Sequence, residues 1–153
     1  MEALVESDAT FTDRFGVPVV AGWAGFSEAI PFALDAARAA DRALWGPYLF
    51  FDGEGDGQLV GFGGFKGPPV DGAVEIGYAI APPRQGRGLA TAATRLMIDI
   101  AARADIRVVV AHTLAEHDAS TAVLARCGFA PVGTEPDPDG EVDEKVWRWE
   151  LSA

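Results

Sequence analysis

Residues 89–103 carry the clearest hydrophobic pattern in the chain, an apolar stripe at helical spacing. Apolar side chains recur every three or four positions, whereas Thr91, Arg95, Asp99 and Arg103 fall largely off the stripe. This spacing predicts an amphipathic helix that packs on a sheet. The stripe consists of Leu89, Ala92, Ala93, Leu96, Met97, Ile100 and Ala101.

Two further segments have helical patterns. An apolar stripe covers residues 27–44, with Ser27 as an N-cap and Pro31 tolerated in the first turn. A shorter helix is predicted over Asp118–Cys127, and Gly128 suits a left-handed position just after it.

Short apolar runs that are rich in β-branched and aromatic side chains predict strands. An Asp/Gly-rich turn at 52–57 joins the first two strands as a hairpin, and an acidic turn at 135–140 joins the last two. The strands on either side of the long helix should pair in parallel, because the connection between them is long. The predicted strands are Tyr48–Phe51, Gln58–Phe65, Glu75–Ala81, Ile106–His112, Phe129–Thr134 and Glu144–Leu151.

Length and composition favour one domain. The chain has 153 residues, of which 49% are hydrophobic, and it shows no internal repeat, linker or low-complexity segment. These properties predict a single compact domain over residues 1–153. Residues 1–26 give no clear pattern, and only Val17–Val20 has the composition of a short strand.

The net charge narrows the class of partner. With 12 basic and 23 acidic residues, the chain carries a formal charge of −11. Such a surface disfavours nonspecific binding to nucleic acid and to anionic membranes, so we expect neither as a partner. An anionic ligand would need a local basic spot.

Other broad features point to a cytoplasmic location. Cys127 is the only cysteine, which excludes an intramolecular disulfide. The first residues form no signal peptide, and no apolar run approaches the ~18 residues that span a bilayer. With two histidines and one cysteine, no metal-ligand spacing is present, so no metal is expected.

The strand over Glu75–Ala81 leads into the segment with the most distinctive chemistry. Pro82 and Pro83 end the strand, and a loop containing Gly86 and Gly88 precedes the long helix. Glycines allow a tight turn, and the unpaired N–H groups at a helix start attract phosphate. Arg84 and Arg87 add positive charge, so the sequence predicts an anion-binding loop.

Four ordered motifs carry a resemblance to a known family. They are Gln-Gly-Arg-Gly-Leu-Ala at 85–90, Val-Val-Val-Ala-His-Thr at 108–113, Glu-His-Asp-Ala-Ser at 116–120 and Val-Leu-Ala-Arg-Cys-Gly-Phe at 123–129. Their order and spacing resemble the GNAT superfamily of acyl-CoA-dependent N-acyltransferases, and within it the branch of ribosomal-protein N-terminal acetyltransferases. The resemblance covers roughly residues 58–135. It implies an α/β fold with a central, mostly antiparallel sheet, one splayed parallel strand pair and flanking helices.

The resemblance also implies acetyl-CoA as the acetyl donor. In this family the loop binds the pyrophosphate through backbone N–H groups, and the preceding strand pairs with the pantetheine arm. Asp118 stands where the family often carries an Asn that binds pantetheine, and it could equally be a helix N-cap. The implied contacts are Tyr78, Ala79, Ile80, Gln85, Gly86, Arg87, Gly88, Leu89, Ala90, Thr91 and Asp118.

For catalysis the resemblance implies an amine that attacks the thioester directly. Glu75 is the candidate base, acting directly or through a water, and a solvated strand carboxylate is the alternative. Ser120 resembles a serine that lies near the thioester sulfur, although an ordinary helix serine fits equally well. Many members use a Tyr acid at the position that Leu124 occupies here.

The sequence leaves alternatives open for the role of His112, for the function and for the acceptor. His112 fits a satisfied interior or edge histidine better than a base. The missing Tyr acid and Asp118 allow a noncatalytic acyl-CoA-binding or regulatory module, whereas an unrelated nucleotide-binding domain fits the later motifs poorly. The acidic charge favours a cationic amine as acceptor, on a small molecule or a protein. The expected oligomeric state is a monomer or a homodimer. In a homodimer, an exposed edge strand near Trp147 could pair with the other copy.

Overall fold

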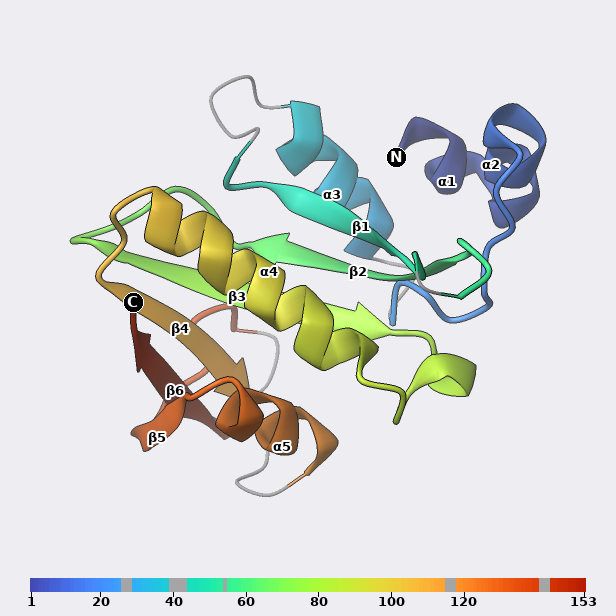
Figure 1. The fold of residues 1–153 in the computed structure, drawn as a ribbon. Coiled ribbons are helices and arrows are strands. Elements are labelled where there is room, and N and C mark those ends of the chain that lie inside the picture. Colours follow the sequence, from blue (N-terminus) through green and yellow to red (C-terminus); the bar gives the residue numbers. More distant parts are fainter. Residues whose placement is uncertain (26–28, 39–43, 54, 115–117, 141–143) are drawn as a thin grey trace. The chain divides into compact units, whose positions relative to one another are not determined.

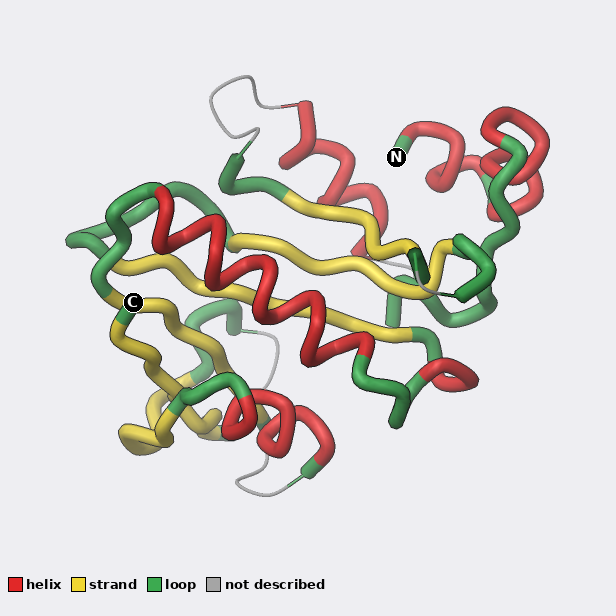
Figure 2. The backbone as a smooth tube through the Cα atoms, in the orientation of Figure 1, coloured by secondary structure: helices red, strands yellow, loops and turns green. Residues whose placement is uncertain are grey.

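The computed structural model describes residues 1–153 except 26–28, 39–43, 54, 115–117 and 141–143. It is a mixed α/β structure with a six-stranded sheet in the order β1-β2-β3-β4-β6-β5. The pairs β1–β2, β4–β6 and β5–β6 are antiparallel, and β3–β4 is parallel. These observations confirm the predicted fold class. Figure 2 colours the helices and strands separately.

The chain divides into two compact units, and β3 (Ala73–Ile80) contributes residues to both. The first unit contains Met1–Pro68 and Tyr78–Ala90, and the second contains Pro69–Gly77 and Thr91–Ala153. In Figure 1 the elements of the first unit are α1 (Glu2–Glu6), α2 (Asp8–Phe15), α3 (Ala29–Arg38), β1 (Pro47–Phe51), β2 (Leu59–Phe65) and the 3-10 turn η2 (Pro82–Arg84).

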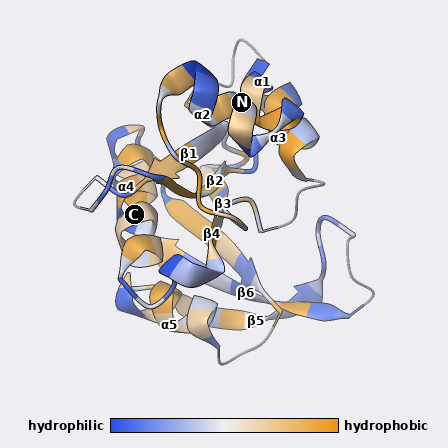
Figure 3. Ribbon diagram, turned by 90° about the vertical axis from the view of Figure 1, so that its right-hand side faces the viewer, coloured by the Kyte–Doolittle hydropathy of each residue, from blue (hydrophilic) through white to orange (hydrophobic). Residues whose placement is uncertain are grey.

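Helix α4 (Leu89–Arg103) starts at the end of the first unit and continues into the second. The predicted strands agree with the observed ones within two residues at each end. The remaining elements of the second unit are β4 (Val108–Thr113), α5 (Ala119–Arg126), β5 (Ala130–Pro136) and β6 (Lys145–Ser152). Strand β4 is hydrophobic along most of its length in Figure 3, as expected of an interior strand.

Two helices occupy the N-terminal stretch in which no helix was predicted. The Ser7 hydroxyl accepts a hydrogen bond from the Thr10 amide at 2.9 Å and so caps the start of α2. Gly16, with φ of 69°, ends that helix. The strand predicted at Val17–Val20 is wrong: Val19 makes only an isolated parallel bridge to Leu59, because turns follow at residues 21–25.

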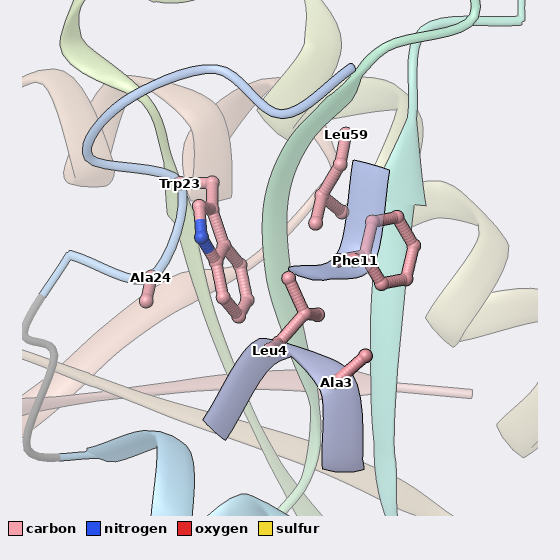
Figure 4. Close-up of a cluster of buried hydrophobic side chains, with 6 residues drawn as sticks. All are labelled: Ala3, Leu4, Phe11, Trp23, Ala24 and Leu59. Carbon is pink, nitrogen blue, oxygen red and sulfur yellow. The ribbon is translucent and has the colours of Figure 1, made fainter. Parts of the chain in front are cut away.

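A hydrophobic cluster in the first unit packs these N-terminal helices against β2. Trp23 is 2% exposed, and its indole N–H donates to Asp8 Oδ1 at 3.0 Å. Its ring also meets Phe62 edge-on, with 5.6 Å between the centroids. Trp23 is therefore a core residue. Figure 4 shows the cluster, which consists of Ala3, Leu4, Phe11, Trp23, Ala24 and Leu59.

Helix α4 has the predicted bounds, but its buried face differs from the predicted stripe. Leu96 is 64% exposed and Ala92 is also exposed, whereas Thr94 is fully buried. Side-chain polarity misplaced the stripe because threonine, which carries a methyl group beside its hydroxyl, can lie on a buried helix face; the hydroxyl oxygen of Thr94 is itself buried. The buried positions are Thr91, Ala93, Thr94, Met97 and Ala101.

Helix α3 is shorter than predicted within the described part of the chain. Pro31 lies in its first turn, as expected, and Leu44 lies in a turn rather than in the helix. Ser27, the predicted cap, lies outside the described residues. A search of the described residues finds no helix that is long and apolar enough to cross a membrane.

Candidate functional site

The loop between β3 and α4 is built to leave space above two glycines. Gly86 and Gly88 have φ values of 76° and 79°, a region that favours glycine. A Cβ atom added at either glycine would meet nothing within 4 Å. Gln85–Gly88, which we call the Gly loop, is exposed and leads directly into Leu89, the first residue of α4.

The start of α4 suits an anion. The first backbone N–H groups of a helix have no partner within the helix, and the macrodipole places positive charge there. No acidic side chain lies in this first turn to compete for them. Leu89 and Ala90 are half-buried in that turn, whereas Thr91 is buried and its carbonyl lies 3.8 Å from Cys127 Sγ. The residues present therefore fit a phosphate group at the Gly loop.

The two arginines predicted to bind the anion have different surroundings. Arg84 donates to Asp56 Oδ2 at 2.9 Å and lies 3.4 Å from Asp52 Oδ2, and its side chain is only 15% exposed. The hydrogen bond from Arg84 lowers the pKa of the Asp56 carboxyl. Arg84 therefore holds the β1–β2 turn, a structural role that the sequence did not predict for it. Arg87, in the Gly loop, is exposed.

Gln85 ties the Gly loop to the end of β3. Its side-chain amide donates to the backbone carbonyl of Ile80 at 3.1 Å. Tyr78 and Ala79 are half-buried, and Ile80 is 8% exposed. This hydrogen bond fixes Gln85, the first residue of the Gly loop, relative to the end of β3.

The parallel pair β3–β4 is joined over a short ladder. It matches Ala73–Glu75 with Val108–Val110. Among the described residues of the second unit, neither Ile76 nor Gly77 continues this ladder.

Glu75 lies in a hydrogen-bonded network with residues from three other strands. His112 Nδ1 is 2.7 Å from Glu75 Oε1, and His112 Nε2 is 2.5 Å from Glu135 Oε1. The His112 side chain is 9% exposed, against 21% for Glu75 and 35% for Glu135. The prediction of a satisfied histidine at position 112 is confirmed. Its contact with Glu75 was not predicted, although a parallel pairing of their strands was.

Arg148 completes this group, which we call the His112 network. Its Nη1 atom is 3.5 Å from Glu135 Oε1, and its Nε donates to Glu150 Oε1 at 2.8 Å. The hydrogen bond from His112 lowers the pKa of Glu135, and the charge of Arg148 lowers it further. Glu135 is thus an anion held between two donors.

Asp118 and Ser120 stand at the start of α5. The Asp118 carboxylate accepts from the Thr121 amide at 2.9 Å, and the Asp118 amide donates to Thr121 Oγ1 at 2.8 Å. This capping box confirms the N-cap interpretation of Asp118. Ser120 is half-buried, and Leu124, where the resemblance led us to expect a Tyr acid, is 1% exposed.

Comparison with known proteins decides the family. A protein-family model described as an acetyltransferase (GNAT) domain matches residues 2–130. The chain belongs to the GNAT acetyltransferase family. This finding confirms the resemblance seen in the four sequence motifs. Compared by sequence with curated proteins, this GNAT chain gives no significant match.

Solved structures agree with this assignment. RimJ of Mycobacterium smegmatis, solved in complex with CoA-disulfide, is 25% identical, with a TM-score of 0.67 over 83% of the GNAT chain and 62% of RimJ. The ribosomal-protein-S5-alanine acetyltransferase of Vibrio fischeri is 17% identical, with a TM-score of 0.64 over 84% and 70% of the two chains.

A further match is yncA of Salmonella typhimurium, solved with its cofactor acetyl-CoA. It is 24% identical, with a TM-score of 0.54 over 63% of the GNAT chain and 60% of yncA. The likeness to yncA and to the V. fischeri enzyme is one of fold. The GNAT chain spans 60%, 57% and 61% of the lengths of three of the structures that it matches.

Proposed function

We propose that this GNAT chain transfers an acetyl group from acetyl-CoA to a primary amine of a small molecule or a protein. The amine attacks directly in a ternary complex, without a covalent intermediate on the enzyme. The observation that carries this proposal is the Gly loop, whose two glycines leave open space in front of a helix start free of acidic side chains. RimJ, 25% identical and solved with a CoA derivative, supports the choice of donor.

The donor would be held by backbone groups more than by side chains. N–H groups of the Gly loop and of the first turn of α4 would bind its phosphates, with Arg87 adding charge. The end of β3 would pair with the pantetheine arm. The proposed contacts are Tyr78, Ala79, Ile80, Gln85, Gly86, Arg87, Gly88, Leu89, Ala90, Thr91 and Asp118.

Acetyl-CoA supplies a thioester, whose C–S bond breaks as the N–C bond of the amide forms. Glu75 would accept the proton that the amine must lose, directly or through a water. Ser120 or a water would donate a proton to the departing sulfur. A backbone N–H near Ile80 would donate to the carbonyl oxygen as negative charge develops on it.

The acceptor is proposed only as a class. A net charge of −11 favours cationic amines at the protein surface, with a protein N-terminus or a polyamine as examples. Nucleic acid and membranes are not proposed as partners, and the protein is expected in the cytoplasm as a monomer or homodimer.

A second candidate is a noncatalytic acyl-CoA-binding or regulatory module. Two observations favour it: the position of the usual Tyr acid holds a buried leucine, Leu124, and the Asp118 carboxylate is engaged in a helix cap. Such a module would keep the Gly loop and bind the donor without turning it over.

Calorimetric titration of acetyl-CoA into the purified protein tests the proposal, with ATP and dephospho-CoA as controls. Selective micromolar binding supports the assignment, and no binding contradicts it. Release of free CoA in the presence of a panel of amines then separates the two candidates. Binding without amine-dependent release would favour the noncatalytic module.

A further inference from the structure

The His112 network lies on one face of the strands β3, β4, β6 and β5. Glu75 pairs with Val110, and His112 lies two residues further along β4, so both side chains project to the same face. His112 pairs with Arg148, and Glu135 pairs with Val146, which lies two residues before Arg148. The register thus brings these side chains together from four strands.

The contacts of His112 fix the number of protons in the network. A neutral imidazole has one N–H and one lone pair, whereas both ring nitrogens here face carboxylate oxygens at 2.7 and 2.5 Å. A lone pair facing a carboxylate oxygen would be repelled. Two short contacts of this kind therefore require a ring with both nitrogens protonated, or a proton on one carboxylate.

The surrounding charges favour the proton on the ring. The groups that face His112 are Glu75 from β3, Glu135 from β5 and Arg148 from β6, and Arg148 also binds Glu150. An imidazolium that is 9% exposed has a counter-charge on each side, which is the usual condition for burying a charge.

We propose that His112 is a positioning residue, which as an imidazolium donates its Nδ1–H to Glu75 and holds that carboxylate in one orientation. Glu135 anchors the far side of the ring through Nε2–H. This role rests on the proposed function, in which Glu75 accepts the proton of the amine. Because an ionised carboxylate offers about four lone-pair sites, a bond to His112 leaves it able to accept that proton.

Two substitutions separate the two sides of the ring. In His112→Asn the amide nitrogen can stand in for Nδ1 and still donate to Glu75. In His112→Gln the amide nitrogen reaches toward the position of Nε2, so the bond to Glu135 is kept and the bond to Glu75 is lost. The two variants have similar polarity, and each is the control for the other.

We expect His112→Gln to lower kcat for amine-dependent CoA release by roughly 10- to 100-fold, the size expected when a reacting group is misplaced. We expect His112→Asn to retain most of the activity. The acetyl-CoA affinity of both variants should stay within about threefold of the parent, because His112 is not among the proposed contacts to the donor. Equal kcat in the two variants would overturn the proposal.

A measurement on the unmodified network does not depend on the folding of a variant. The ¹⁵N shifts of the His112 ring, assigned with the help of His117→Gln, should show both nitrogens protonated in the folded protein. A single-protonated tautomer would overturn the proposal. If the parent protein neither binds acetyl-CoA nor releases CoA, the proposed function fails. If the parent turns over and His112→Gln matches it, only the positioning role fails.

Discussion

The guanidinium of Arg84 donates to the carboxylate of Asp56 across 2.9 Å. It also reaches Gln58 Oε1 at 3.2 Å, so η2 is tied to the turn between β1 and β2. Arg84 lies one residue before the Gly loop, and Arg87 lies within it. Neighbouring arginines of one motif therefore have different roles, one structural and one available to a ligand.

Substitution of the two arginines should separate stability from affinity. Arg87→Ala removes a charge from the Gly loop and should weaken acetyl-CoA binding by about tenfold, the equivalent of ~1.4 kcal/mol, with little change in Tm. Arg84→Ala breaks the contacts to the β1–β2 turn and should lower Tm, with a smaller effect on affinity. Calorimetry and thermal unfolding test this. An equal loss of affinity in both variants, without a Tm shift in Arg84→Ala, would contradict it.

The second prediction places a charge in the Gly loop. Gly88→Asp adds a carboxylate in the space proposed for phosphate and should abolish acetyl-CoA binding while the fold remains intact. Calorimetry measures the binding, and circular dichroism checks the fold.

Gly140→Asp is the matched control for this substitution. Gly140 has a φ of 67°, and a Cβ there would also meet nothing within 4 Å, but it lies in the turn after β5. It should carry a similar backbone strain without loss of affinity. Unchanged affinity in Gly88→Asp would refute the assignment of the Gly loop to the donor.

The third prediction concerns the pH dependence of stability at Glu135. Its folded pKa lies below the ordinary value of 4.5, because His112 donates to it and Arg148 lies nearby. A depressed carboxyl pKa stabilises the folded state above the unfolded pKa, and this contribution is lost as pH falls through the folded pKa. Thermal unfolding from neutral pH to below 4.5 should therefore show a steeper loss of Tm in the parent than in Glu135→Gln. Parallel curves would be the contrary result.

Local patterns could be predicted from the sequence, whereas long-range contacts could not. The bounds of α4 and the parallel pair β3–β4 could be predicted, because helical period and connection length act within one segment. The contact between His112 and Glu75 could not be predicted, since it depends on the register between two strands. The two residues are 37 positions apart in the sequence. Asp52 and Asp56 fitted a hairpin turn, and nothing local indicated that they also bind Arg84.

The N-terminal helices could have been found from local signals. Ser7 is a residue type preferred at helix N-caps, and Gly16 is a helix stop at a suitable distance. The glycines and aromatic residues further along obscured them. Their packing was not predictable, because Trp23 reaches Asp8 only once the chain turns back at residues 21–25.

The fourth prediction tests the corrected face of α4 with two adjacent residues. Met97 is 2% exposed, so Met97→Ala should leave a cavity and cost ~2–5 kcal/mol of unfolding free energy. Leu96 is 64% exposed, and Leu96→Ala should change stability by less than about 0.5 kcal/mol. Denaturant unfolding of both variants measures this. Similar losses of stability in the two variants would contradict the observed buried face of α4 and would support the predicted apolar stripe, which contains both residues.

The last prediction concerns the reactivity of Cys127. Burial raises the pKa of this thiol above its ordinary value of 9.0, and its sulfur lies 3.8 Å from the carbonyl oxygen of Thr91. Because the thiolate is the reactive species, a raised pKa leaves less of it at neutral pH. The folded protein should therefore react with iodoacetamide several-fold more slowly than the same protein in denaturant, followed by mass spectrometry. Equal rates in the two states would contradict the prediction that burial protects this thiol.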